Sequence, residues 1–202
     1  MDKPILRYPV IVEGKYDKIK LDSLFRGQIF PLDGFGVFKD IEKRAFFQKL
    51  AEKTPLIVLT DPDGGGKVLR RFLSGVLPPE RVFHLHIPKK KGKEARKKAP
   101  SKEGTLGVEG MDAEILRTLF APYLLPADES GTDDAFPVPP PLSGEEMYAL
   151  GLSGVPGAAE RRAALCKAAG LPEDLTTPAL RRTLPLLFSR VELQSMLHRI
   201  GI

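Results

Sequence analysis

The chain has 202 residues and a formal net charge of +5, with 42% hydrophobic residues, no tryptophan and a single cysteine. This length accommodates one domain of average size and a small second one. The lone Cys166 excludes an internal disulfide and a multi-cysteine zinc site, and no segment approaches the roughly 18 apolar residues that a membrane-spanning helix needs. We therefore expect a cytoplasmic protein in a reducing compartment, with no membrane partner.

The first 122 residues alternate between strand-like and helix-like apolar patterns. Short β-branched or continuous apolar runs indicate strands, whereas apolar residues three and four apart indicate helices. The predicted elements are a strand at 9–12, a helix with Leu21, Leu24 and Phe25 on one face, a strand at 28–32, a helix at 39–53, a strand at 55–60, a helix around 68–76, a strand at 81–87 and a helix around 115–120. This alternation predicts an α/β fold in which helices flank a parallel sheet.

The composition changes from Ala121 onward, where proline becomes frequent. Proline fits neither a helix interior nor a central strand. We therefore interpret residues 123–142 as a Pro-rich acidic linker between an α/β domain at 1–122 and a small all-α domain at 143–202. The helix-start signals of the last segment are capping boxes at Ser143–Glu146 and Ser189–Glu192, and Thr177 as a cap before Pro178.

The positive charge is concentrated in one segment. Residues 88–102 hold eight Lys or Arg residues and one Glu, a local charge of +7, so the rest of the chain sums to −2. A local basic cluster is the electrostatic footprint expected for a polyanion, and a solvated loop is the alternative interpretation. The residues expected to attract nucleic acid here are Lys89, Lys90, Lys91, Lys93, Arg96, Lys97 and Lys98.

Carboxylates follow two of the predicted strands directly. Glu13 comes after the strand at 9–12, and Asp61 and Asp63 come after the strand at 55–60. In parallel α/β sheets, ligands bind beyond the carboxyl ends of the strands. Because Mg²⁺ prefers oxygen ligands and usually takes one or two carboxylates, the pattern predicts a divalent-cation site. A turn or helix cap is the alternative for a single Asp-x-Asp pair.

Two stretches carry a resemblance to a known family. "VIVEGKYDKIKL" (10–21) and "IVLTDPDGGGKVLRRFL" (57–73) resemble the Toprim domain, whose hallmarks are a glutamate after the first strand and Asp-x-Asp after a later one. "GTLGVEGMDAEILRTLF" (104–120) and "YALGLSGVPGAAERRAAL" (148–165) resemble the bacterial ribonuclease M-five (M5) family. That family joins a Toprim domain to a helical domain and matures the 5S ribosomal RNA precursor, with a ribosomal protein as a partner of the RNA.

The resemblance implies metal-assisted hydrolysis of a phosphodiester. Asp61 and Asp63 would hold Mg²⁺, or Mn²⁺ in its place, and Glu13 would complete the coordination or act as a general acid or base. Asp17 and Glu109 are secondary candidates for the same acidic pocket. Because aromatic residues are sparse near the basic residues, we expect recognition of a structured RNA by shape rather than by base stacking.

Further cations lie near the motifs or on the predicted C-terminal helices. Those near the motifs are Lys15, Lys18, Lys67 and Arg70, which can meet phosphates close to the metal. Arg161 and Arg162 lie on a predicted helix, where they contact an RNA backbone or form an ordinary exposed face. His84 and His86 share one face of a strand, and without a third ligand nearby we favour packing over zinc.

Two other function classes stay open from the sequence alone. The first is a Toprim-like module that binds nucleic acid or a ribosome-assembly intermediate without cutting it. The second is a primase-like or DNA-nicking enzyme, which needs nucleotide-handling elements or a nucleophilic tyrosine. Of the four tyrosines only Tyr16 is close to the acidic motifs, and packing is its simpler role.

Overall fold

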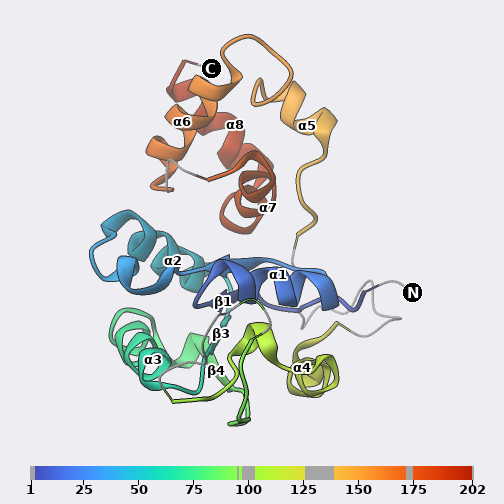
Figure 1. The fold of residues 1–202 in the computed structure, drawn as a ribbon. Helices are drawn as coiled ribbons and strands as arrows, with labels where there is room; N and C mark the ends of the chain where they lie inside the picture. Colours follow the sequence, from blue (N-terminus) through green and yellow to red (C-terminus); the bar gives the residue numbers. More distant parts are fainter. Residues whose placement is uncertain (1–2, 95, 97–102, 126–138, 172–174, 202) are drawn as a thin grey trace. The chain divides into compact units, whose positions relative to one another are not determined.

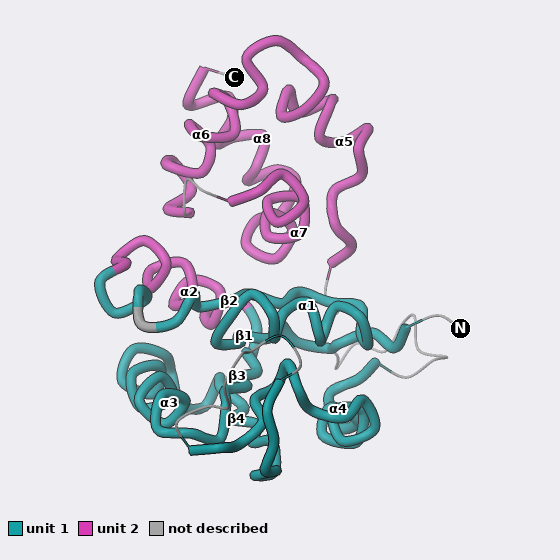
Figure 2. The backbone as a smooth tube through the Cα atoms, viewed as in Figure 1, with its two compact units in different colours: residues 1–39, 54–137 teal, residues 40–53, 138–202 magenta. Residues whose placement is uncertain are grey.

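The computed structural model describes residues 3–94, 96, 103–125, 139–171 and 175–201 (Figure 1). The chain divides into two compact units, one made of residues 1–39 and 54–137 and the other of residues 40–53 and 138–202 (Figure 2). The predicted linker at 123–142 lies mostly outside the described residues, and the predicted domain boundaries stay a prediction.

The first unit contains a four-stranded parallel sheet. Its strands are β1 (Val10–Val12), β2 (Ile29–Pro31), β3 (Leu56–Thr60) and β4 (Val82–His86), in the order β2-β1-β3-β4. In the register between the two central strands, Val12 lies opposite Leu59. The residues that follow β1 and β3 therefore leave the sheet at the same edge. The predicted α/β fold with a parallel sheet and flanking helices is confirmed.

Helices α1 (Lys15–Leu24), α3 (Gly64–Val76) and α4 (Ala113–Phe120) belong to the same unit. One core cluster joins alternate residues of the central strands, such as Val10 and Ile57, to Leu21 of α1 and Phe120 of α4. Every residue of β3 is buried, as expected of a strand covered on both faces. Short 3₁₀ helices lie at η1 (Gly34–Phe38), η2 (Pro79–Arg81), η3 (Val108–Gly110) and η4 (Ala121–Tyr123).

The second unit is helical. Its helices are α2 (Ile41–Lys53), α5 (Gly144–Ala149), α6 (Ala158–Ala169), α7 (Thr177–Leu187) and α8 (Arg190–Arg199). Although α2 comes early in the chain, its Lys49 donates a 2.8 Å hydrogen bond to the Ala169 carbonyl at the end of α6. The same ammonium lies 4.7 Å from the ring centroid of Phe188. These contacts tie α2 to the C-terminal helices (Figure 2).

The predicted capping boxes of α5 and α8 are confirmed, because Ser143 and Ser189 each exchange hydrogen bonds with the glutamate three residues later. The cap of α7 differs from the prediction. Thr176, not Thr177, accepts the hydrogen bond from the Ala179 N–H, and Thr177 is the first residue of the helix. None of the helices in the described part of the chain is long and apolar enough to cross a lipid bilayer.

Candidate active site

The ends of β1 and β3 are joined by a hydrogen bond between the two acidic motifs. The Asp61 N–H donates to Glu13 Oε1, with 2.6 Å between the nitrogen and the oxygen. Since β1 and β3 are parallel neighbours, Glu13 and Asp61 follow their strands at the same edge of the sheet, within hydrogen-bonding distance of each other. The structure thus brings together two carboxylates that lie 48 residues apart in the sequence.

The Asp61 carboxylate is fixed from a second direction. Its Oδ1 accepts a 2.8 Å hydrogen bond from the Val108 N–H at the start of η3. Two glycines make this close packing possible. A Cβ on Gly107 would lie 2.3 Å from Asp61 Oδ2, and a Cβ on Gly66 would lie 2.1 Å from the Asp61 carbonyl oxygen. Neither position has room for a side chain.

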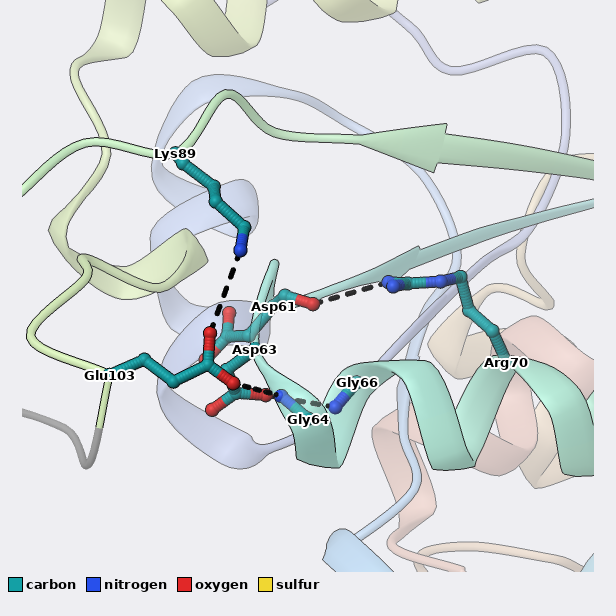
Figure 3. Close-up of polar contacts among 7 residues, drawn as sticks. All are labelled: Asp61, Asp63, Gly64, Gly66, Arg70, Lys89 and Glu103. Atoms are coloured by element: carbon teal, nitrogen blue, oxygen red, sulfur yellow. Dashed lines mark hydrogen bonds and ion pairs between the residues drawn. The ribbon is translucent and has the colours of Figure 1, made fainter.

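Asp63 has a different local role from Asp61. It is the N-cap of α3, and its Oδ1 accepts a 2.9 Å hydrogen bond from the Gly66 N–H (Figure 3). The Gly64 N–H, in the first turn of α3, donates a 2.7 Å hydrogen bond to Glu103 Oε1. The other carboxylate oxygen of Glu103 lies 3.7 Å from Lys89 Nζ. The beginning of α3 therefore already holds two carboxylates.

A cavity of about 250 Å³ opens at this edge of the sheet. It is lined by Glu13, Gly14, Tyr16, Asp17, Gly34, Asp61, Glu94, Arg96 and Glu109. The cavity thus gathers five carboxylates and one guanidinium. Among the predicted residues, Glu13, Asp61, both secondary acidic candidates and the basic residue Arg96 line it, whereas Asp63 does not.

Burial and the neighbouring Asp61 charge change the protonation of two carboxylates of the cavity. The pKa of Glu13 is raised from 4.5 to about 7. Burial is the largest cause, the Asp61 charge is the next, and the Asp63 charge contributes less. Burial and the Asp61 charge also raise the pKa of Asp17 from 3.8 to about 7, although the Gly14 N–H donates to its Oδ2 at 3.0 Å. The cavity therefore carries more negative charge than its own cations balance.

The residues present fit a hard divalent cation by their chemistry. All the acidic groups offer oxygen ligands, and a cation would offset the burial and the repulsion by Asp61 that raise these pKa values. Within the described ranges, however, no three His, Cys, Asp or Glu side chains form a ready metal-binding group. Because Asp63 caps α3, Glu13 and Asp61 are the carboxylates best placed to hold a cation in the cavity.

The cations near the motifs divide into inward and outward groups. Arg70 of α3 turns toward the end of β3, where its Nη1 contacts Thr60 Oγ1 and lies 3.2 Å from the Asp61 carbonyl oxygen (Figure 3). Lys15 and Lys67 are exposed, and Lys18 pairs with an aspartate one turn along α1. Arg70 therefore supports the site through its contacts at the end of β3.

Within the lysine-rich segment, the described lysines are only partly available. Lys89 pairs with Glu103 and Lys90 pairs with Asp112, while Lys91 and Lys93 are exposed. Lys97 and Lys98 lie outside the described residues. In the helical unit, Arg162 donates at 2.8 Å to the Leu152 carbonyl and Arg161 is half-buried.

The similar proteins of known name described here are ribonucleases M5. Ribonuclease M5 1 of Ligilactobacillus salivarius is 27% identical over 161 residues, which cover 80% of this chain and 75% of that protein. Ribonuclease M5 of Bacillus subtilis is 26% identical, over 76% of this chain and 73% of that protein. The chain resembles the ribonuclease M5 proteins. The likeness expected from the sequence motifs is thereby confirmed.

A further match to ribonuclease M5 has a higher identity over a smaller part of each chain. The Streptococcus pneumoniae protein is 32% identical over 55% of this chain, which spans 56% of that protein's own length. No protein-family model matches the chain. Among solved structures, a small TOPRIM domain protein from Bacillus stearothermophilus is 19% identical, with a TM-score of 0.35 over 58% of this chain and 86% of that one.

Two acidic residues of the site were missed by the sequence interpretation of this ribonuclease M5-like chain. Glu94 is only 2% exposed and accepts a 3.0 Å hydrogen bond from the Gly107 N–H, and Glu103 caps α3. Both glutamates stand in or beside the lysine-rich run, so their neighbours indicated only a basic surface. The one feature of the sequence that could have indicated their role is the position of an acidic residue among basic ones.

Proposed function

We propose that this protein is a magnesium-dependent endoribonuclease that cuts a structured RNA, with the 5S ribosomal RNA precursor as its substrate. The observation that carries the proposal is the pairing of Glu13 with Asp61 at the edge of the cavity, in a chain that resembles ribonuclease M5. Mn²⁺ would serve in place of Mg²⁺. A 5S-binding ribosomal protein that folds the RNA is the expected partner.

The carboxylates divide the chemical work. Glu13 and Asp61 would hold the cation, which when bound stabilises the charge that develops on the scissile phosphate. The alternative role for Glu13 is that of a general acid or base outside the coordination sphere, for which its pKa of about 7 without a metal is suited. Asp63 would position the site through the start of α3. Asp17 and Glu109 would set the negative charge of the cavity.

The exposed lysines would draw the RNA toward the cavity. Lys91 and Lys93 carry no partner that would hold them away from a phosphate backbone in the described part of the chain, and Lys15 and Lys67 are exposed beside the acidic motifs. Such contacts release counterions, so RNA binding should weaken steeply as salt rises.

A second candidate is a module that binds RNA without cutting it. The observation that favours it is the role of Asp63 as a helix cap, which leaves the described carboxylates without a ready metal-binding group. The DNA-nicking alternative needs a nucleophilic tyrosine, and the Tyr16 ring, which is 43% exposed, instead lies 3.9 Å from the Arg96 guanidinium carbon in a cation–π contact.

A panel of substrates distinguishes the two candidates. The wild-type protein would be incubated with the 5S precursor, with and without the ribosomal protein, in Mg²⁺ or in EDTA, beside single- and double-stranded DNA. We expect Mg²⁺-dependent cuts in the RNA precursor and none in DNA. Tight RNA binding with no product in any condition would instead identify the binding module.

A further inference from the structure

The lysine-rich segment forms a paired arm beside the cavity. We use the term basic arm for residues 88–94, Arg96 and residues 103–106. The Leu106 N–H donates to the Lys90 carbonyl at 2.8 Å, and the Gly92 N–H donates to the Gly104 carbonyl at 3.0 Å. Since these two stretches run antiparallel, the arm returns to the sheet edge where it began. The arm is therefore anchored at the site.

The arm contributes two side chains to the cavity, and one of them is a cation. Arg96 lines the cavity together with Glu13, Asp61 and Glu109. Its Nε and Nη2 lie 3.2 Å from the two carboxylate oxygens of Glu109, which is a bidentate pair. Its guanidinium carbon also lies 3.9 Å from the centroid of the Tyr16 ring. The guanidinium is thus held from two directions.

The contacts with Glu109 and Tyr16 leave part of the Arg96 guanidinium available to a ligand. Arginine carries five N–H donors, and Glu109 uses the hydrogens of only two nitrogens on one edge. Among the side chains that line the cavity, Arg96 is the single cation. We propose that Arg96 binds a phosphate of the nucleic acid in this cavity, and that Glu109 and Tyr16 hold it in position to do so. The identity of the ligand as RNA rests on the proposed function.

The surrounding carboxylates make this contact conditional. Five acidic side chains repel a phosphate from the cavity until a divalent cation neutralises part of their charge. Arg96 should therefore strengthen RNA binding only when such a cation is present. A lysine on the outside of the arm, such as Lys93, should strengthen binding equally with and without the cation.

The first test is equilibrium binding of the 5S precursor, in Ca²⁺ and in EDTA, to the wild type, Arg96→Ala and Lys93→Ala. Ca²⁺ takes the same oxygen ligands as Mg²⁺. We expect Arg96→Ala to weaken binding about tenfold or more in Ca²⁺ and less than about twofold in EDTA, as for a charge-assisted hydrogen bond. Lys93→Ala should weaken binding to the same extent in both. Equal losses in the two buffers for Arg96→Ala would overturn the proposal.

A conservative variant separates phosphate binding from simple charge balance. Lysine keeps the charge at position 96 but has no planar fork to pair with Glu109 and stack on Tyr16. We expect Arg96→Lys to behave in Ca²⁺ like Arg96→Ala. Wild-type binding by Arg96→Lys would mean that the residue only neutralises Glu109. In the same assay, Tyr16→Phe should keep most of the affinity and Tyr16→Ala should lose it.

Cleavage gives a second measurement with a distinct outcome. If the wild type cuts the precursor, Arg96→Ala and Arg96→Lys should lower kcat about 100-fold or more, as the loss of one donor to a developing oxyanion does. Unchanged kcat in both variants would contradict the proposal. If the wild type cuts no RNA, the proposed function fails, and the cation-dependent binding of the first test still decides the role of Arg96.

Discussion

Asp61 is held by its side chain, its N–H and its carbonyl at once. Glu13 accepts from the N–H at 2.6 Å, the Val108 N–H donates to the carboxylate at 2.8 Å, and Arg70 lies 3.2 Å from the carbonyl oxygen. A carboxylate fixed in this way loses little freedom when it binds a cation, so its position is preorganised. The adjacent glycines are the residues whose replacement would disturb this arrangement most.

Gly66→Ala tests the packing around Asp61. A Cβ at this position would lie 2.1 Å from the Asp61 carbonyl oxygen and 2.7 Å from Glu13 Oε1, so the backbone has to shift. We expect the free energy of unfolding to fall by about 2–4 kcal/mol in a denaturant titration. The control is Gly75→Ala in the same helix, where a Cβ meets nothing within 4 Å. Alanine should stabilise that position by about 0.5–1 kcal/mol, and equal losses in both variants would contradict this account.

The raised pKa values predict how stability depends on pH without metal. The folded protein keeps protons on Glu13 and Asp17 up to about pH 7, whereas their ordinary pKa values are 4.5 and 3.8. Because the folded state binds more protons between these limits, the free energy of unfolding should fall as pH rises from about 4 to 7. For the buried Asp17 the fall should be at least on the order of 1 kcal/mol.

Unfolding titrations in EDTA between pH 5 and pH 8 measure this dependence, with Glu13→Gln and Asp17→Asn as comparisons. Each variant should flatten the curve, since its side chain no longer titrates. Added Mg²⁺ should raise the midpoint of thermal unfolding more at pH 8 than at pH 5, because protons no longer compete for the carboxylates. Stability that rises with pH in EDTA would be incompatible with the clustered carboxylates.

At the scale of elements, the site depends on how α3 is fastened to the end of β3. Arg70 reaches from the second turn of α3 to the Asp61 carbonyl (Figure 3). It also contacts the Thr60 hydroxyl. Thr60 is fully buried, so this hydroxyl has no access to water. The sequence interpretation treated Arg70 as a phosphate contact, and the geometry gives it a supporting role.

Arg70→Met keeps the length of the side chain and removes its donors. We expect the free energy of unfolding to fall by about 1–3 kcal/mol, because buried acceptors lose their partner. The slope of RNA affinity against salt should stay unchanged, since the guanidinium is held by Thr60 and Asp61 rather than by a phosphate. The neighbouring Arg71 is exposed, so Arg71→Met should change stability by less than about 0.5 kcal/mol. A salt slope reduced by about one in Arg70→Met would restore the phosphate-contact role.

Elements were easier to predict from the sequence than side-chain roles. The apolar runs before Glu13 and Asp61 located β1 and β3, because a strand buried on both faces must be apolar throughout. The role of Asp63 as a helix cap was open, since Asp-x-Asp fits both a cap and a metal ligand. The pairing within the basic arm was not predictable, because it depends on backbone hydrogen bonds that leave no apolar pattern.

At the scale of the whole molecule, an acidic cavity lies next to a basic arm. The cavity gathers carboxylates from the ends of β1 and β3, from α1, from η3 and from the basic arm, and the arm also carries exposed lysines. This arrangement suits an enzyme that attracts a polyanion with one surface and treats its phosphates at a cation held by the other. The likeness to ribonuclease M5 covers up to 80% of the chain in the matches described above.

The most direct test of this account is the rate of RNA precursor cleavage as a function of Mg²⁺ for the wild type, Asp61→Asn and Asp22→Asn. Asp22 is a matched control because it lies on α1, outside the cavity, and pairs with Lys18. We predict that Asp61→Asn loses at least about 100-fold in rate at every Mg²⁺ concentration while it still binds RNA through the exposed lysines, and that Asp22→Asn behaves like the wild type. Wild-type rates in Asp61→Asn would show that the cavity is not the place where RNA is cut.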